Sequence, residues 1–159
     1  MDPTSVALIV NAGGESRRMG KNKALLPLPP DNTPLIVSIV RRLAPLVSDR
    51  VIIVTSDALV RETLAQYFAA TVIDDRWPAG GALGGIARGL SACLEWSMVV
   101  ACDMPLVDRT IFTKLIDIAK REPNLDAVIP LIDNRGQPFH GLWHKRSLPH
   151  LEAKLARGE

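Results

Sequence analysis

Short apolar runs alternate along this chain with stretches in which apolar residues recur every three or four positions. The runs at residues 6–10, 51–54, 71–73, 98–101 and 127–129 predict strands. Because these runs are almost continuously apolar, we expect strands that helices cover on both faces of a sheet.

The stretches between the strands predict amphipathic helices. Thr33-Pro34, Asp57 and Asp108 are expected to begin three of them, and Pro45 is expected to end the first. A last helix is predicted over residues 147–157. The side chains expected to face inward are Ile36, Ile39, Val40, Leu43, Val60, Leu64, Tyr67, Leu83, Ile86, Ala87, Leu90, Leu94, Phe112, Leu115, Ile116, Ala119, Leu148, Leu151 and Leu155.

This alternation of strands and helices indicates an α/β fold with three layers, α/β/α and Rossmann-like, around a mainly parallel sheet. The 159 residues are enough for a core of their own, and we expect residues 1–159 to form a single domain. We find no internal repeat, and the proline-rich segment at residues 27–32 is interpreted as a loop.

The composition is ordinary for a soluble globular protein, with 47% apolar and 23% charged residues. A formal net charge of +2 argues against general binding of nucleic acid. No apolar run approaches the roughly 18 residues that a membrane-spanning helix needs, and the polar residues 1–5 do not resemble a signal peptide. Cys93 and Cys102 have neither metal nor redox spacing and are expected to be buried thiols. We therefore expect a cytoplasmic protein without membrane or nucleic-acid partners.

The positive charge is concentrated in the segment after the first strand. Residues 11–23 contain three glycines, Gly13, Gly14 and Gly20, and four cations, Arg17, Arg18, Lys21 and Lys23. Glycine allows backbone N–H groups to approach a ligand, and the cations neutralise negative charge, so this loop predicts phosphate binding. It is not a Walker A loop, because Asn22 follows Lys21 where a hydroxyl residue is needed, and it lacks the Rossmann G-x-G-x-x-G pattern.

Several segments, spread over nearly the whole chain, form a recognisable set. They are Ala12-Gly13-Gly14, Ser16-Arg17-Arg18-Met19-Gly20, Lys23-Ala24-Leu25-Leu26, Val72-Ile73-Asp74-Asp75, Gly80-Gly81-Ala82-Leu83-Gly84-Gly85-Ile86, Ala101-Cys102-Asp103-Met104-Pro105 and Gln137-Pro138-Phe139-His140-Gly141-Leu142-Trp143. In this order they resemble the molybdenum cofactor guanylyltransferases, which are MobA-like nucleotidyltransferases. The first loop and the Asp103-Met104-Pro105 turn carry the resemblance best when taken together. It implies the nucleotidyltransferase form of the fold.

In an open parallel sheet, ligands bind beyond the carboxyl ends of the strands, where the first loop, Asp75 and Asp103 are expected to lie. The Asp103 carboxylate could hold Mg²⁺ against phosphate oxygens or cap the following turn, for which Asp108 is the better candidate. The resemblance favours the metal role, because the magnesium aspartate of the family lies in this position. It also places the ammonium of Lys23 on the triphosphate.

The resemblance implies a full set of site residues. Nucleotide binding falls to Ala12, Gly13, Gly14, Lys23, Asp75, Gly84 and Asp103, and catalysis to Lys23, Arg17 and Asp103. Structural interpretations stay open beside these: Asp75 in a strand-end turn, residues 80–85 as a tight connection to a helix, and either Arg17 or Arg18 as a solvated side chain. The histidines lack zinc spacing, and His140 lies with Gln137 and Trp143 in a segment that resembles the family's acceptor side.

The resemblance implies Mg²⁺-dependent transfer of GMP from GTP to molybdenum-bound molybdopterin, giving the guanine dinucleotide cofactor and pyrophosphate. The terminal phosphate of the pterin is already ionised, so no general base is required. Transient contacts with molybdoenzymes or other cofactor-biosynthesis proteins are expected. Three alternatives stay open: an enzyme of the same superfamily that uses CTP or a sugar phosphate, a non-catalytic nucleotide-binding module, and a NAD-linked dehydrogenase, which the missing glycine pattern argues against.

The chain departs from the family pattern at two places. Asn11 stands where the family usually has an apolar residue, and it is expected either to cap the loop or to contact the nucleotide. Family members also continue past the equivalent of residues 156–159 with a further strand and helix, which the predicted domain lacks.

Overall fold

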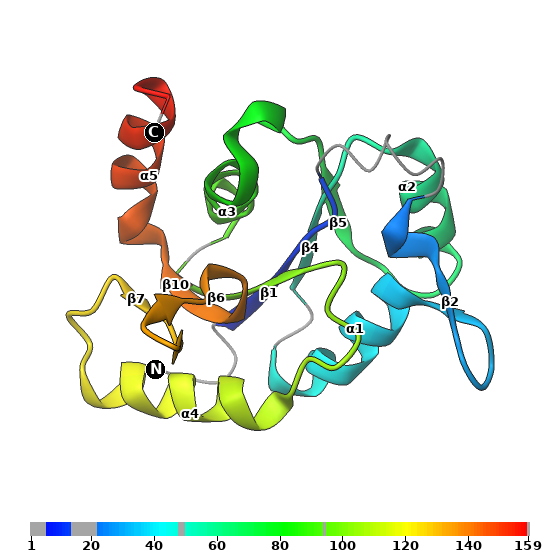
Figure 1. Cartoon of the computed structure of the whole chain (residues 1–159), viewed down its shortest axis with the longest axis horizontal. Helices are drawn as coiled ribbons and strands as arrows, with labels where there is room; N and C mark the ends of the chain where they lie inside the picture. Colours follow the sequence, from blue (N-terminus) through cyan, green and yellow to red (C-terminus); the bar gives the residue numbers. More distant parts are fainter. Residues whose placement is uncertain (1–5, 14–21, 48–49, 94, 159) are drawn as a thin grey trace.

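A computed structural model of the chain describes residues 6–13, 22–47, 50–93 and 95–158. Within these residues, six strands form one sheet, and one of them, β10, runs antiparallel to its two neighbours (Figure 1). In spatial order the strands are β5 (Thr71–Ile73), β4 (Val51–Val54), β1 (Val6–Asn11), β6 (Trp96–Ala101), β10 (Gly141–His144) and β7 (Ala127–Val128).

The register of the central strands brings their carboxyl ends to one level. Asn11, the last residue of β1, pairs with Val54 of β4 on one side and with Ala101 of β6 on the other. Val54 in turn pairs with Ile73, the last residue of β5. The segments that follow these four strands therefore leave the sheet along a single edge.

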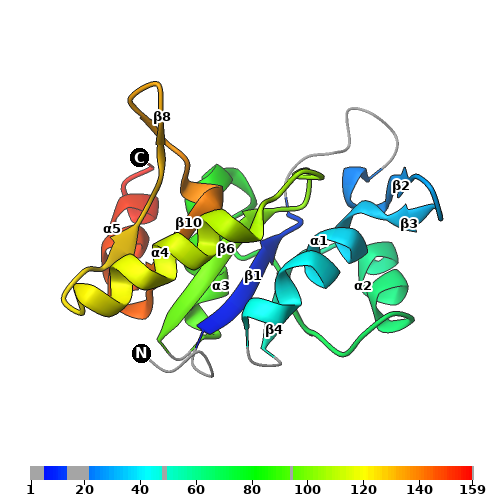
Figure 2. The same ribbon diagram turned by 90° about the horizontal axis from the view of Figure 1, so that it is seen from below.

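Helices cover both faces of the sheet (Figures 1 and 2). The alternation of side chains along β1 separates the two cores, because neighbouring residues in a strand point to opposite faces. Leu8 and Val10 belong to one apolar cluster and Ala7 and Ile9 to the other. The first cluster includes residues of α1 (Leu35–Leu43), α2 (Ala58–Ala65) and α4 (Arg109–Arg121), and the second includes residues of α3 (Gly81–Ser91) and α5 (Leu148–Ala156).

This architecture confirms the predicted three-layer α/β fold and most of its elements. Asp57 and Asp108 cap α2 and α4 as expected, each accepting a hydrogen bond from a backbone N–H group in the first turn. The predicted inward face of α4 is buried at all of its positions, namely Phe112, Leu115, Ile116 and Ala119.

Two details of the prediction were wrong. Thr33 is not the N-cap of a helix, because Thr33 and Pro34 form β3 (Thr33–Pro34), which pairs with β2 (Pro27–Leu28). Pro34 takes the N-cap position of α1 without a side-chain hydrogen bond. The Thr33 hydroxyl instead donates to Asp31 at 2.6 Å. Tyr67 does not face inward, since it is 41% exposed and lies under the guanidinium group of Arg41.

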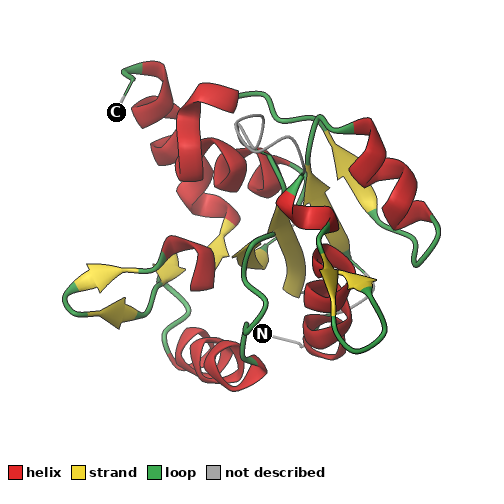
Figure 3. Cartoon of the chain, turned by 45° about the vertical axis from the view of Figure 1, so that its right-hand side comes forward, coloured by secondary structure: helices red, strands yellow, loops and turns green. Residues whose placement is uncertain are grey.

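The sequence also failed to predict three pieces of β-structure. The antiparallel strand β10 extends the sheet beyond β6. The β2–β3 hairpin and a second hairpin of β8 (Leu131–Ile132) and β9 (Arg135–Gly136) project from the body of the molecule (Figures 2 and 3). The predicted inward residue Leu94 lies outside the described residues. In the described part of the chain, no helix has the length and apolar character that crossing a bilayer requires.

Two glycines allow α3 to lie directly on β1. A Cβ atom at Gly89 would come within 2.4 Å of Ile9 Cγ2, and one at Gly85 within 2.4 Å of the Asn11 carboxamide carbon. Since Gly85 lies over Asn11 and Gly89 over Ile9, α3 runs opposite to β1. Its N-terminus is therefore at the edge where the strands end.

We predict that Gly89→Ala destabilises the protein, because the new methyl group must displace the buried Ile9 or lift α3 from the sheet. Overpacking costs about 1–3 kcal/mol, of which better helix propensity returns at most about 1 kcal/mol. Urea unfolding followed by circular dichroism measures the change. Gly136→Ala is the control, because a Cβ there would meet Ile129 Cγ2 at an ordinary 3.7 Å. Equal stabilities of the two variants would contradict the close packing of α3.

Candidate functional site

The edge of the sheet gathers four segments that are far apart in the sequence. Beyond the strand ends, backbone hydrogen bonds continue to join them: Ala12 N–H to Val54 C=O (2.9 Å), Thr55 N–H to Ile73 C=O (2.9 Å) and Cys102 N–H to Asn11 C=O (3.0 Å). The beginning of the first loop, the turn after β4, the Asp74-Asp75 pair and the Cys102-Asp103 turn thus lie side by side. This is the edge at which ligands bind in open α/β sheets.

Asn11 shapes the start of the first loop. Its side chain is buried, and Oδ1 accepts a hydrogen bond from the backbone N–H of Gly13 at 3.2 Å. An asparagine that bonds two residues ahead turns the chain locally. The bond confirms that Asn11 caps the loop, and the contact of its carboxamide with Gly85 ties this turn to α3.

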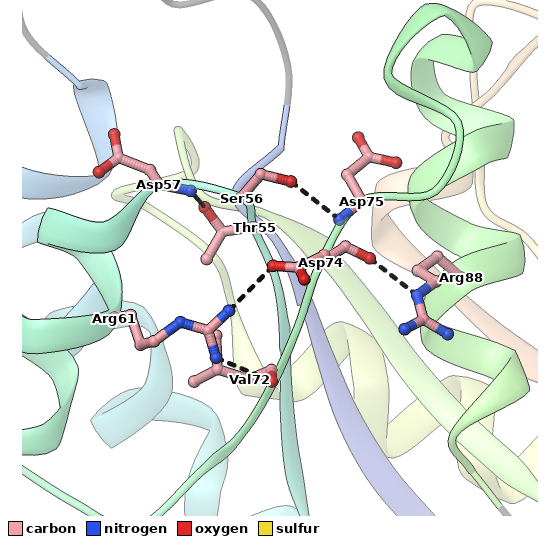
Figure 4. A network of polar contacts seen from close by, with 8 residues as sticks. All are labelled: Thr55, Ser56, Asp57, Arg61, Val72, Asp74, Asp75 and Arg88. Atoms are coloured by element: carbon pink, nitrogen blue, oxygen red, sulfur yellow. Dashed lines mark hydrogen bonds and ion pairs between the residues drawn. The ribbon is translucent and has the colours of Figure 1, made fainter.

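Asp75 faces the first loop. Its backbone N–H donates to Ser56 Oγ at 3.2 Å (Figure 4). Its Oδ1 accepts from the N–H of Trp77 at 2.9 Å. The other carboxylate oxygen lies where a side chain at Gly13 would be, since a Cβ there would come within 2.6 Å of Asp75 Oδ2. Gly13 and Asp75 were both predicted as site residues, and the structure brings them into contact.

Asp74 points elsewhere, as expected for adjacent residues at the end of a strand. Its carboxylate pairs with Arg61 at 3.0 Å, and its backbone C=O accepts from Arg88 Nε at 2.8 Å (Figure 4). Arg61 also donates to the C=O of Val72. The Arg61–Asp74 pair is well exposed and contributes little to stability, but together with Arg88 it fixes the backbone that presents Asp75.

The charges of Asp103 and Lys23 both act on one thiol, that of Cys102. Burial and, to a smaller extent, the charge of Asp103 raise the pKa of Cys102 to about 11, and the charge of Lys23 partly opposes this shift. Both charges therefore act on the same sulfur atom, although Lys23 and Asp103 are far apart in the sequence. The two side chains themselves are exposed, Asp103 in the turn after β6 and Lys23 in the short 3₁₀ helix Lys23–Leu25.

The carboxylates at this edge suit a hard cation that is held partly by the protein and mainly by the phosphate oxygens of a bound substrate. Within the described ranges, no group of three or more His, Cys, Asp or Glu side chains is arranged to hold a metal ion. Mg²⁺ is commonly bound through one or two carboxylates together with phosphate oxygens. The exposed carboxylate of Asp103 fits that mode of binding, and the described histidines do not form a metal cluster.

The glycine-rich segment builds the start of α3. Gly81 has φ +53°, a conformation that favours glycine, at the point where the 3₁₀ helix Pro78–Gly80 turns into α3. A Cβ at Gly84 would lie 2.6 Å from the C=O of Trp77, so this glycine is needed for a tight connection. The N-terminus of α3, whose N-cap residue Gly80 has no side chain to bond the first turn, is directed to the edge of the sheet. The nucleotide-binding role of Gly84 stays a prediction.

The late segment reaches the same edge from the opposite direction. Because β10 is antiparallel to β6, its first residue, Gly141, lies toward the carboxyl end of β6, opposite Val99. The 3₁₀ helix Pro138–His140 precedes it. The His140 ring stacks on Phe112 at 6.3 Å, and partial burial lowers the pKa of this histidine. Trp143 is buried and donates to the C=O of Pro138 at 3.1 Å, so it holds this turn in place.

Several predicted residues cannot be placed. Arg17 and Gly14, with the neighbouring Arg18 and Lys21, lie outside the described residues. Sequence reasoning also missed residues that organise the site, above all Ser56 and Arg61, which hold the Asp74-Asp75 pair. Their signal was weak, because a serine after a strand and an arginine on a helix are common features of α/β proteins.

Comparison with known proteins agrees with this geometry. Residues 8–159 match the model of the MobA-like NTP transferase domain. The molybdenum cofactor guanylyltransferase of Vibrio cholerae is 33% identical over 161 aligned residues, which cover 100% of this chain and 75% of that protein. A probable molybdenum cofactor guanylyltransferase of Bacillus cereus is 33% identical over 150 residues, covering 92% and 72%. The solved structure of molybdopterin-guanine dinucleotide biosynthesis protein A from Archaeoglobus fulgidus superimposes with a TM-score of 0.75 at 25% identity, covering 96% and 74%.

We predict that the pKa of Cys102 reports the two charges of the site. Asp103→Asn should lower this pKa from about 11, and Lys23→Gln should raise it, because each removes a charge that acts on the thiol. The measurement is the rate of Cys102 alkylation by iodoacetamide against pH, read by peptide mass spectrometry. Lys145→Gln is the control, since Lys145 acts on Cys93. A Cys102 pKa that neither site variant moves would show that neither charge acts on this thiol.

Proposed function

The chain belongs to the MobA-like NTP transferase family and is a nucleotidyltransferase, and we propose that it transfers GMP from GTP to molybdenum-bound molybdopterin. The product would be the guanine dinucleotide form of the cofactor, with pyrophosphate released. The observation that carries this proposal is the 33% identity, over the whole chain, to a protein named molybdenum cofactor guanylyltransferase. The edge of the sheet supports it, because the beginning of the glycine-rich first loop lies there beside Asp75 and the Cys102-Asp103 turn.

The proposed nucleotide side is built from the first loop and the segments beside it. Ala12, Gly13 and Gly14 are assigned to the nucleotide. Because the N–H groups of Ala12 and Gly13 are bonded to Val54 C=O and Asn11 Oδ1, these two residues would contribute close backbone approach rather than donors to the phosphates. Asp75 is assigned to the base or ribose, and Gly84 to the wall of the base pocket. The contact between Gly13 and the Asp75 carboxylate supports this assignment, because it puts the two predicted nucleotide contacts next to each other.

The proposed chemistry needs no proton transfer by the protein. An ionised oxygen of the terminal phosphate of molybdopterin forms a bond to the α-phosphorus of GTP. The bond between this phosphorus and the oxygen bridging to the β-phosphate breaks, and its electron pair leaves with pyrophosphate. Lys23 and Arg17 would neutralise the charge of the triphosphate and orient it for in-line attack.

Asp103 is assigned to hold Mg²⁺ together with phosphate oxygens. When bound there, Mg²⁺ supplies charge neutralisation for the triphosphate and the departing pyrophosphate. The exposed position of Asp103 in the turn after β6 supports this role, as does the action of its charge and that of Lys23 on the same thiol. The turn Pro138–His140, which reaches the edge beside β6, is the proposed acceptor side, with Gln137 and His140 as contacts for the pterin or its phosphate.

The proposal is tested by measuring binding and turnover with the same nucleotides. Calorimetry with GTP, CTP, ATP and UTP, with and without Mg²⁺, should show Mg²⁺-dependent binding that prefers GTP. Pyrophosphate release should then require molybdenum-bound molybdopterin as well. Preference for CTP would contradict the choice of base. Binding of GTP without pyrophosphate release, in the presence of acceptor and Mg²⁺, would contradict the transfer reaction and favour a non-catalytic nucleotide-binding module.

We predict that Asp103→Ala lowers the rate of pyrophosphate release by at least about 10²-fold, as expected when an electrostatic contact of the transition state is lost. The fold should persist because the side chain is exposed, and thermal unfolding by circular dichroism should be nearly unchanged. Asp117→Ala, which removes an exposed carboxylate from α4, is the control and should keep full activity. Turnover close to that of the unmodified protein in Asp103→Ala would remove Asp103 from the mechanism.

A further inference from the structure

We propose that Asp57 is a positioning residue of the proposed reaction, which fixes the backbone at Lys23 through a hydrogen bond with Asn22. This inference rests on the proposed function, because that function gives Lys23 its task at the triphosphate. It adds two residues, Asn22 and Asp57, whose part in the site neither the sequence nor the family resemblance indicated.

Asp57 is itself held firmly in the turn between β4 and α2. Its backbone N–H donates to Thr55 Oγ1 at 3.1 Å, and its Oδ1 accepts from the N–H groups of Leu59 at 2.9 Å and Val60 at 3.3 Å. These bonds make Asp57 the N-cap of α2. In Figure 4 its carboxylate points away from Asp75, toward the ribbon that carries the end of the first loop.

The second carboxylate oxygen of Asp57 makes a contact that a helix cap does not need. Asp57 Oδ2 accepts a hydrogen bond from Asn22 Nδ2 at 2.7 Å, across 35 positions of the sequence. Asn22 Oδ1 at the same time accepts from the N–H of Ala24 at 3.0 Å. One amide side chain thus joins the turn after β4 to the backbone on the far side of Lys23.

This Asn22–Asp57 link fixes Lys23 from both sides. Asn22 precedes Lys23 and is bound to Asp57, while Ala24 follows it and is fully buried in the core. The Asn22 bond is also the largest influence that lowers the pKa of Asp57, so the carboxylate accepts this bond as an anion. The flexible side chain of Lys23 consequently starts from a fixed backbone, which lowers the entropy lost when its ammonium is placed on a phosphate.

The link can be broken and rebuilt without losing the helix cap. Asp57→Asn keeps an oxygen for Leu59 and Val60, because asparagine is an equally good N-cap, but turns its NH₂ group against that of Asn22. Asn22→Asp brings two carboxylates together. The exchanged double variant, Asn22→Asp with Asp57→Asn, restores one donor and one acceptor and keeps the net charge. Asp108→Asn, at the corresponding N-cap of α4, is the control for the cap alone.

Pyrophosphate release is measured for each variant at varied GTP. We expect each single variant to lower kcat about 10- to 100-fold while changing the KM for GTP much less, because misplacing a catalytic group costs rate. The exchanged variant should recover most of kcat, and Asp108→Asn should keep it. Single variants with full kcat and only a lower melting temperature would overturn the proposal, as would an exchanged variant that regains stability but not kcat.

Failure of the proposed function would be seen separately. If the unmodified protein releases no pyrophosphate from any of the four triphosphates, that function is contradicted. The Asn22–Asp57 link is then judged by hydrogen exchange of the Ala24 amide. Faster exchange in both single variants and restored protection in the exchanged variant support the link, whereas unchanged exchange in Asp57→Asn overturns it.

Discussion

The direct packing of α3 on β1 is the contact on which the candidate site depends. It is possible because Gly85 and Gly89 have no side chains where Asn11 and Ile9 approach the helix. With α3 held this close, its N-terminus opens onto the edge where the strands end, and the buried side chain of Asn11 is fixed between the helix and the first loop. A larger residue at either glycine would separate the helix from the very residues that it helps to position.

From this contact, the polar groups of the edge divide into two kinds. Some hold the backbone: Arg61 and Arg88 bind Asp74, and Ser56 binds the N–H of Asp75. Others hold no backbone group within the described residues: the second oxygen of Asp75 lies against Gly13, and the side chains of Lys23 and Asp103 are exposed. The adjacent aspartates show this division most clearly, because one is used in the framework and the other is turned toward the first loop.

Much of the fold could be predicted because its signals are local. A continuous apolar run such as residues 6–10 indicates a buried strand by itself, and Asp57 and Asp108 were recognised as caps from the few residues around them. The strand β10 was missed because it is short and is defined by its pairing with β6, which no local pattern reveals. Thr33-Pro34 misled the prediction for a related reason: a threonine before a proline is typical of a helix start, but here Pro34 pairs with Pro27 in a hairpin. The same limit applies to the site. The edge positions of Asp75 and Asp103 follow from strand ends, whereas the bond between Asn22 and Asp57 depends on how distant segments meet.

The reversed direction of β10 has a consequence for how such a protein diversifies. The turn Pro138–His140 enters the edge before its strand begins, whereas the first loop and the Asp75 and Asp103 turns leave the edge after their strands end. Changes in the length or chemistry of residues 137–140 therefore leave the ladder between β1, β4 and β6 unaltered. The residues of the proposed acceptor side can therefore change during evolution to bind a different acceptor, while the residues proposed to bind the triphosphate stay the same. Because β10 is antiparallel, selection for the acceptor and selection for the triphosphate act on different segments of the same sheet.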